Sequence, residues 1–85
     1  MAKLVRSTHS IRSIKRVPTG HVIEVVRGVE TTRYTRVRGG WTARVSHGEY
    51  SPWEDVTTVF TSWEVAQQVN TVAPYHTREH HAYIF

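Results

Sequence analysis

Three histidines in the last ten residues are the side chains whose types and spacing best suit chemistry. His76 and His80 are four positions apart, and Glu79 and His81 adjoin the second of them. On a helix, His76 and His80 would share a face and could hold a divalent metal with one further ligand. Pro74 disfavours a rigid helix here, and the segment lacks the HExxH arrangement of metalloproteases. We therefore expect a mobile, partly charged segment with no bound metal.

Other catalytic groups are not brought together by the sequence. None of the six serines lies in a GxSxG nucleophile elbow. Ser46 and His47 are neighbours, and neighbouring residues of a strand point to opposite faces. Glu54 and Asp55 are also adjacent, whereas two-carboxylate catalysis needs both groups to face one substrate. No glycine-rich phosphate loop is present. We expect a non-enzymatic protein that needs no cofactor.

The charges are divided unequally along the chain. Residues 1–48 contain ten of the eleven lysines and arginines but only two of the seven acidic residues. Nine of the eleven basic residues are arginines, whose planar guanidinium suits phosphates and base edges. A basic region of this kind attracts phosphate groups, and an acidic region repels them. The same distribution would also serve as an ordinary solvated surface, so nucleic-acid binding is one of two interpretations.

Runs of β-branched residues, separated by glycine and proline, indicate strands. They predict strands over residues 21–27, 32–37, 41–46 and 56–60. Thr61, with Glu64 three positions later, has the capping-box pattern that opens a helix, and valines continue at helical spacing to Val72. The sequence therefore predicts an α+β fold, in which a three- to four-stranded antiparallel sheet packs against one short helix in the C-terminal half.

The chain divides into three parts around this domain. Residues 1–16 form a basic N-terminal arm, which could be a short helix, an edge strand or a segment that orders only on binding. Residues 17–73 form the sheet-plus-helix domain. Residues 74–85 form a His-rich aromatic tail, whose aromatic end could add a last strand.

The hairpin around Gly39 and Gly40 decides which side chains share a face. A two-residue loop of both glycines would place the apolar face of one strand against the charged face of the other. A three-residue loop, residues 38–40, pairs Val37 with Trp41 and ends on glycine, which adopts the left-handed conformation without steric cost. This second register predicts a core face of Val37, Trp41, Ala43 and Val45. It predicts an outer face that carries Tyr34, Arg36 and Arg44.

Such an outer face would present stacking and phosphate-binding groups together, as β-ribbons and sheets that bind nucleic acid do. The arm would add contacts to the phosphates through Arg12, Lys15 and Arg16. The predicted function is a small non-enzymatic module that contacts nucleic acid through this face and the arm.

A different function is suggested by the tryptophans, because tryptophan is enriched at the energetic centres of protein interfaces. Trp53 lies in a loop with Tyr50 and beside two acidic residues. A patch of Tyr50 and Trp53 would suit a protein partner, and Trp53 could equally fill a small core. The alternative function is therefore an accessory protein that binds and regulates or inhibits a host protein.

The segment Phe60-Thr61-Ser62-Trp63-Glu64-Val65-Ala66, which follows strands joined by a Gly-Gly turn, resembles the strand-to-helix junction of arm-type DNA-binding domains of phage integrases. The resemblance spans residues 32–70 and implies a three-stranded sheet on one helix, with the sheet entering the DNA major groove. Two spacings depart from that family: Phe60 directly precedes Thr61, and Val65 separates Glu64 from Ala66. The arginine-rich, cysteine-free composition is also similar to small phage accessory proteins, which implies a host protein as partner.

Composition also bears on location and assembly. There is no cysteine, and no run approaches the roughly 20 apolar residues of a membrane span. We expect a cytoplasmic protein that makes no use of the membrane. A sheet this small has an unpaired edge strand, which could pair with a second copy to form a homodimer.

Overall fold

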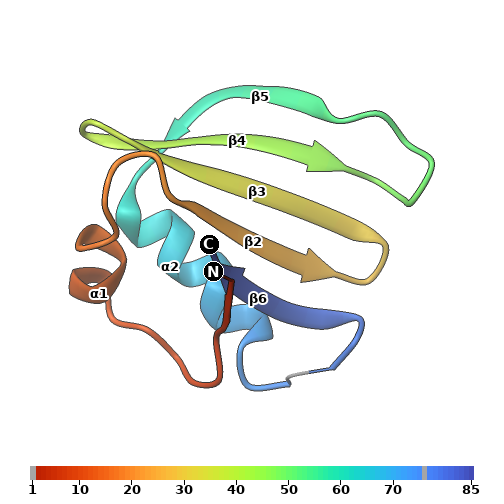
Figure 1. Ribbon diagram of the computed structural model, residues 1–85, viewed down its shortest axis with the longest axis horizontal. Coiled ribbons are helices and arrows are strands. Elements are labelled where there is room, and N and C mark those ends of the chain that lie inside the picture. The colour runs from red at the N-terminus through yellow and green to blue at the C-terminus, as the bar shows by residue number, and fades with distance from the viewer. Residues whose placement is uncertain (1, 76) are drawn as a thin grey trace.

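The computed structural model describes residues 2–75 and 77–85 as six strands and two helices (Figure 1). The helices are α1 (Ile11–Lys15) and α2 (Ser62–Val72). The strands are β1 (Lys3–Leu4), β2 (Val22–Arg27), β3 (Glu30–Val37), β4 (Gly40–Ser46), β5 (Glu54–Phe60) and β6 (His80–Ile84). All neighbouring strands run antiparallel, in the order β1-β6-β2-β3-β4-β5.

One face of the sheet carries the core, and the opposite face has no helix over it in the described part of the chain. Ile23, Val25 and Ala82 point to the core face and are buried with Val65 and Val69 of α2. Since successive strand residues alternate between faces, their neighbours in sequence, such as Val22 and Tyr83, point to the opposite side. We call that side the open face.

Helix α2 begins as the sequence predicts. The Thr61 hydroxyl accepts a hydrogen bond from the Glu64 backbone N–H at 3.1 Å, and the Glu64 carboxylate accepts one from the Thr61 backbone N–H at 3.0 Å. These two bonds satisfy backbone donors that would otherwise lack partners at the first turn. The buried side chains of α2 are Ser62, Val65, Ala66, Val69 and Val72.

The predicted α+β class is confirmed, but the sheet has six strands instead of three or four, and there are two helices. The additional strands come from the ends of the chain. β6 is an interior strand between β1 and β2, and β1 pairs with β6 through Lys3↔Ile84 and Leu4↔Tyr83. The N-terminal segment is packed against the domain, because Val5 and Ile14 belong to the same buried cluster as the sheet and α2.

The predicted register of the β3–β4 hairpin is wrong. Val37 pairs with Gly40 and Arg36 with Trp41, so the loop consists of Arg38 and Gly39. Gly39 has a φ of +84°, which suits glycine, whereas Gly40 is a buried residue of β4. A Cβ on Gly40 would lie 2.9 Å from the Phe60 carbonyl oxygen, so this glycine allows the end of β5 to approach closely. Its role is close packing of the strands, and the sequence pattern alone suggested a loop.

In the described residues, no helix is both long enough and apolar enough to cross a membrane.

Candidate nucleic-acid interface

Helix α1 places three cations at one end of the sheet. Ile14 is fully buried and anchors the helix, while Arg12, Lys15 and Arg16 are exposed around it. The Ser10 hydroxyl caps the helix by accepting from the Ser13 backbone N–H. A five-residue helix is not stable by itself, so the burial of Ile14 must hold it in place.

Two further contacts attach this segment to the domain. The Asn70 side chain of α2 donates to the His9 carbonyl at 2.9 Å and accepts from the His9 backbone N–H at 2.8 Å. Arg36 Nη2 donates to the Lys15 carbonyl at 3.4 Å, and its Nη1 donates to the Gly40 carbonyl at 2.9 Å. The Arg36 guanidinium also lies 5.4 Å from the centre of the Trp41 ring. Arg36 therefore joins α1 to the β3–β4 hairpin.

The hairpin loop adds a fourth exposed cation, Arg38, at the same end. We call Arg12, Lys15, Arg16 and Arg38 the basic end. Arg38 is not among the predicted site residues, although its place beside two glycines is a signal that it lies at a turn. The ion pairs among the described residues involve Arg33, Arg44 and His47, and none uses a cation of the basic end.

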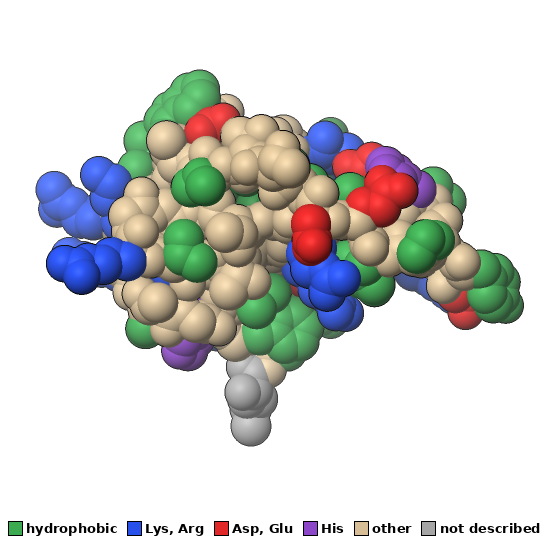
Figure 2. All heavy atoms as spheres, turned by 90° about the horizontal axis from the view of Figure 1, so that it is seen from above, with side chains coloured by type: hydrophobic (Ala, Val, Ile, Leu, Met, Phe, Trp, Pro, Cys, Tyr) green, Lys and Arg blue, Asp and Glu red, His purple; other side chains and the backbone are tan. Residues whose placement is uncertain are grey.

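Most acidic residues lie at the opposite end of the sheet. Figure 2, which views the molecule from the β5 side, shows Lys and Arg side chains projecting at the left, where α1 and the β3–β4 loop lie in Figure 1. Most of the acidic side chains visible there lie toward the other end. Five of the seven acidic residues belong to that end by position, at strand starts and in the loops before them: Glu30, Glu49, Glu54, Asp55 and Glu79.

The predicted outer face of Tyr34, Arg36 and Arg44 does not exist as one surface. Tyr34 pairs with Ala43 and is buried on the core face, and Arg36 lies on the same face over Trp41. Arg44 is on the open face, where its Nε is 3.0 Å from the Asp55 carboxylate. The two-residue loop shifts the register by one position, and this shift moves Tyr34 and Arg36 to the core face.

Of the predicted protein-binding residues, only Tyr50 is strongly exposed, with 94% of its surface accessible at the turn between β4 and β5. Trp53 is half-buried, and the Arg33 guanidinium lies 4.5 Å from the centre of its ring. This stack holds Trp53 against the open face.

The open face also carries a row of aromatic side chains, the aromatic row, which was not predicted from the sequence. His81, Tyr83 and Phe85 occupy alternate positions along β6 and its continuation, so they point to one side. Their ring centres are 5.4 Å apart from His81 to Tyr83 and 6.2 Å apart from Tyr83 to Phe85. The spacing of two residues between aromatic side chains was the sequence signal for this row.

The chain has no similar protein in the comparisons: no family model, no curated protein and no solved structure matches it.

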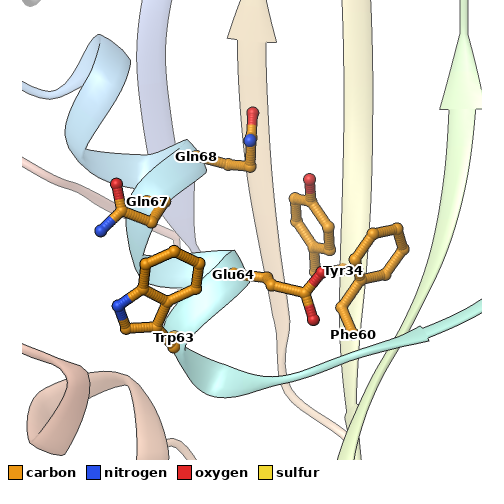
Figure 3. Close-up of a pocket in the computed structure, with 6 residues that line it drawn as sticks. All are labelled: Tyr34, Phe60, Trp63, Glu64, Gln67 and Gln68. Carbon is orange, nitrogen blue, oxygen red and sulfur yellow. The ribbon is translucent and has the colours of Figure 1, made fainter.

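A groove on the core face separates α2 from the end of β5 (Figure 3). It has a volume of about 350 Å³, and Tyr34, Phe60 and Trp63 supply its aromatic surface. Tyr34 and Phe60 meet edge to face at 5.6 Å, and Glu64 points toward them from the helix. Burial raises the pKa of the Tyr34 hydroxyl, which keeps it protonated and able to donate. The Glu64 carboxylate is already engaged in the capping box.

The raised pKa of Tyr34 predicts a loss of stability at high pH. Because the folded-state pKa lies above the unfolded value of about 10, the stabilisation is complete below that pH and is lost as the pH rises toward the folded-state pKa. Between about pH 9 and pH 11, Tyr34→Phe should therefore lose less unfolding free energy than the wild type. Denaturant titrations across this range measure the difference. Tyr50→Phe, at an exposed side chain, is the control and should follow the wild type; equal losses in all three proteins would contradict the prediction.

The histidines are distributed over both faces of β6. His80 lines a hollow near the end of α2 with Tyr75, whereas His81 is on the open face and its Nδ1 lies 2.9 Å from the Thr77 carbonyl oxygen. His80 is in a strand, so the helical arrangement considered for it does not occur; His76 lies outside the described residues. Among the residues that are described, no group of three His, Cys, Asp or Glu side chains is placed to share a metal ion.

Proposed function

We propose that this protein is a non-enzymatic nucleic-acid-binding module and that the basic end is its phosphate-contacting surface. The observation that carries the proposal is the convergence of Arg12, Lys15, Arg16 and Arg38 at one end of the sheet, all exposed and without acidic partners among the described ion pairs. Desolvated contacts between guanidinium groups and phosphates are favourable, and each releases counterions from the nucleic acid.

The placement of the acidic residues supports the same orientation. A phosphate backbone at the opposite end would meet the carboxylates of Glu49, Glu54 and Glu79, which belong to none of the described ion pairs, and be repelled. The cations of the basic end are supplied by a helix fixed through Ile14 and by a two-residue loop, so little chain entropy would be lost when they bind.

The proposal predicts strongly salt-dependent binding. If four cations contact phosphates, the logarithm of the binding constant should fall with the logarithm of the salt concentration, with a slope of about −3 to −4. Replacing Arg16 and Arg38 with glutamine should reduce the magnitude of that slope by about 2 and weaken binding at about 50 mM salt by at least roughly tenfold. Fluorescence anisotropy of a labelled oligonucleotide measures both quantities.

The matched control is the pair Arg44→Gln and Arg78→Gln, which removes the same charge away from the basic end. This variant should keep the slope and most of the affinity. Equal losses in the two double variants would show that only net charge matters, and the basic end would then not be the binding surface.

Binding of a protein partner is the second candidate function. It is favoured by Tyr50, whose side chain is almost fully exposed beside Glu49 in the loop between β4 and β5. Affinity capture from a lysate, with and without nuclease and at two salt concentrations, separates the two functions. A specific protein retained at high salt after nuclease treatment, and lost with Tyr50→Ala, would favour the second function.

A further inference from the structure

The aromatic row of the open face, which consists of His81, Tyr83 and Phe85, ends at a hollow. This hollow is not part of the basic end. Val22, Arg33 and Phe85 line this hollow, which has a volume of about 280 Å³ and a mostly apolar surface. Phe85 has 45% of its surface exposed on one side of it. Arg33 also lines the hollow. A planar group that entered it would therefore meet an aromatic ring and an arginine side chain, and aromatic rings and guanidinium groups are the two surfaces on which nucleobases stack in proteins.

Arg33 is held in place for such a role. Its Nε donates to the Glu24 carboxylate at 2.8 Å, and its guanidinium stacks on the Trp53 ring at 4.5 Å. Glu24 is the cross-strand neighbour of both Arg33 and Tyr83, so it lies on the open face beside both residues. A carboxylate there can accept a hydrogen bond from an amino group of a base.

The hollow adjoins the basic end through a continuous series of contacts. The Phe85 carbonyl oxygen is 2.9 Å from His21 Nδ1, and the His21 carbonyl accepts from the Arg36 backbone N–H at 2.9 Å. Arg36 in turn donates to the Lys15 carbonyl at the end of α1. These contacts place Phe85 at the same end of the sheet as α1. A strand of nucleic acid whose phosphates lie on the basic end would therefore reach Phe85 by passing around this end of the sheet onto the open face.

The arrangement of the rings distinguishes between single-stranded and double-stranded ligands. In each strand of a B-form duplex the bases are stacked 3.4 Å apart and their faces are covered. The rings of His81, Tyr83 and Phe85 are inclined to one another, by 83° between His81 and Tyr83 and by 46° between Tyr83 and Phe85, so they do not form one parallel stack. The covered base faces of a duplex cannot reach such rings, whereas a base freed from its stack can lie on one of them. We propose that the open face binds unstacked bases of a single-stranded nucleic acid, with the first base between Phe85 and Arg33. This inference rests on the proposed function and specifies its ligand.

The test compares a labelled single-stranded DNA of about 12 nucleotides with a duplex of the same sequence, using the full chain at about 50 mM salt. The wild type should bind the single strand more tightly than the duplex. Phe85→Ala should weaken single-strand binding by about 5- to 100-fold, the loss expected for one stacked base, and leave duplex binding unchanged. Phe85→Tyr keeps a stacking ring and should restore single-strand binding. Tyr50→Ala removes an exposed aromatic ring at the opposite end and should behave as the wild type.

The outcomes separate this inference from the proposed function. If Phe85→Ala binds the single strand as the wild type does, or if the wild type prefers the duplex, the inference is wrong, while the loss of binding in the Arg16/Arg38 double variant would still support the function. If that double variant binds both ligands normally, or if the wild type binds neither, the proposed function is wrong and the inference falls with it. A circular dichroism spectrum equal to that of the wild type establishes that Phe85→Ala is folded.

Discussion

Replacing Trp41 with alanine should lower the free energy of unfolding by about 3–5 kcal/mol. Trp41 is fully buried and is the largest side chain of the core, and its indole N–H donates to the Ser62 hydroxyl at 3.1 Å. The substitution leaves a cavity and removes the partner of a buried hydroxyl, and both effects are unfavourable. In a domain of this size, the melting temperature should fall by roughly 12–40 °C. Thermal and denaturant unfolding measure the change.

Trp63→Ala is the matched control for this prediction. Trp63 is the same type of residue, only 22 positions later in the chain, but 55% of its surface is exposed. Its replacement should cost less, about 1–2 kcal/mol, since more than half of its surface stays in water and its removal leaves no enclosed cavity. Equal losses of stability in the two variants would show that Trp41 is not the centre of the core.

The second large effect is expected from Ile14→Ala, which should cost about 2–5 kcal/mol because the side chain is fully buried between α1 and the domain. This substitution removes no charge, yet it should also weaken nucleic-acid binding, because a detached α1 no longer holds Arg12, Lys15 and Arg16 beside Arg38. Denaturant unfolding gives the stability. Anisotropy titrations at low salt give the affinity.

The control for this variant is Ile11→Ala, in the same helix. Ile11 has 39% of its surface exposed, so its truncation should lower stability less than that of Ile14 and should leave α1 attached and binding nearly unchanged. If Ile14→Ala is destabilised but binds nucleic acid with unchanged affinity, the cations of α1 act as a flexible arm, and their fixed placement contributes nothing to binding.

Local signals in the sequence were sufficient to predict the central strands and the helix that packs on them. β2 to β5 are rich in β-branched residues, and the capping box at Thr61 and Glu64 begins α2 at the predicted position. Each of these elements depends mainly on residues close in sequence, so its pattern could be recognised without knowledge of the partner. The α+β class followed from their order.

The ends of the chain could not be predicted in the same way. β1 has only two residues, and β6 begins with two histidines, so neither has a strong strand pattern. Each becomes a strand because it pairs with a segment far away in the sequence, Leu4 with Tyr83 and Ile23 with Ile84. Such pairings are tertiary interactions that override local propensity.

The candidate site, too, could be predicted only in part. The excess of arginine in the first half of the sequence was visible, but its spatial arrangement depended on one residue of hairpin register. The two adjacent glycines predict that Gly40 belongs to the loop, whereas it is a strand residue that allows the end of β5 to approach closely. Because of this one-residue difference in register, Tyr34 and Arg36 lie on the core face. Arg36 became the link between α1 and the hairpin, and Arg38 became an exposed cation.

The excess of cations at the basic end and of carboxylates at the opposite end gives the molecule an electric dipole moment along the strands. A polyanion at a distance exerts a torque on such a molecule and turns the basic end toward itself before any contact forms. For the proposed nucleic-acid ligand, fewer encounters should begin with the wrong surface, and the association rate should exceed that of a protein with the same net charge spread evenly. Salt shortens the range of this torque to about 10 Å at 0.1 M, so the orientation of the protein on approach is lost before the contacts themselves are.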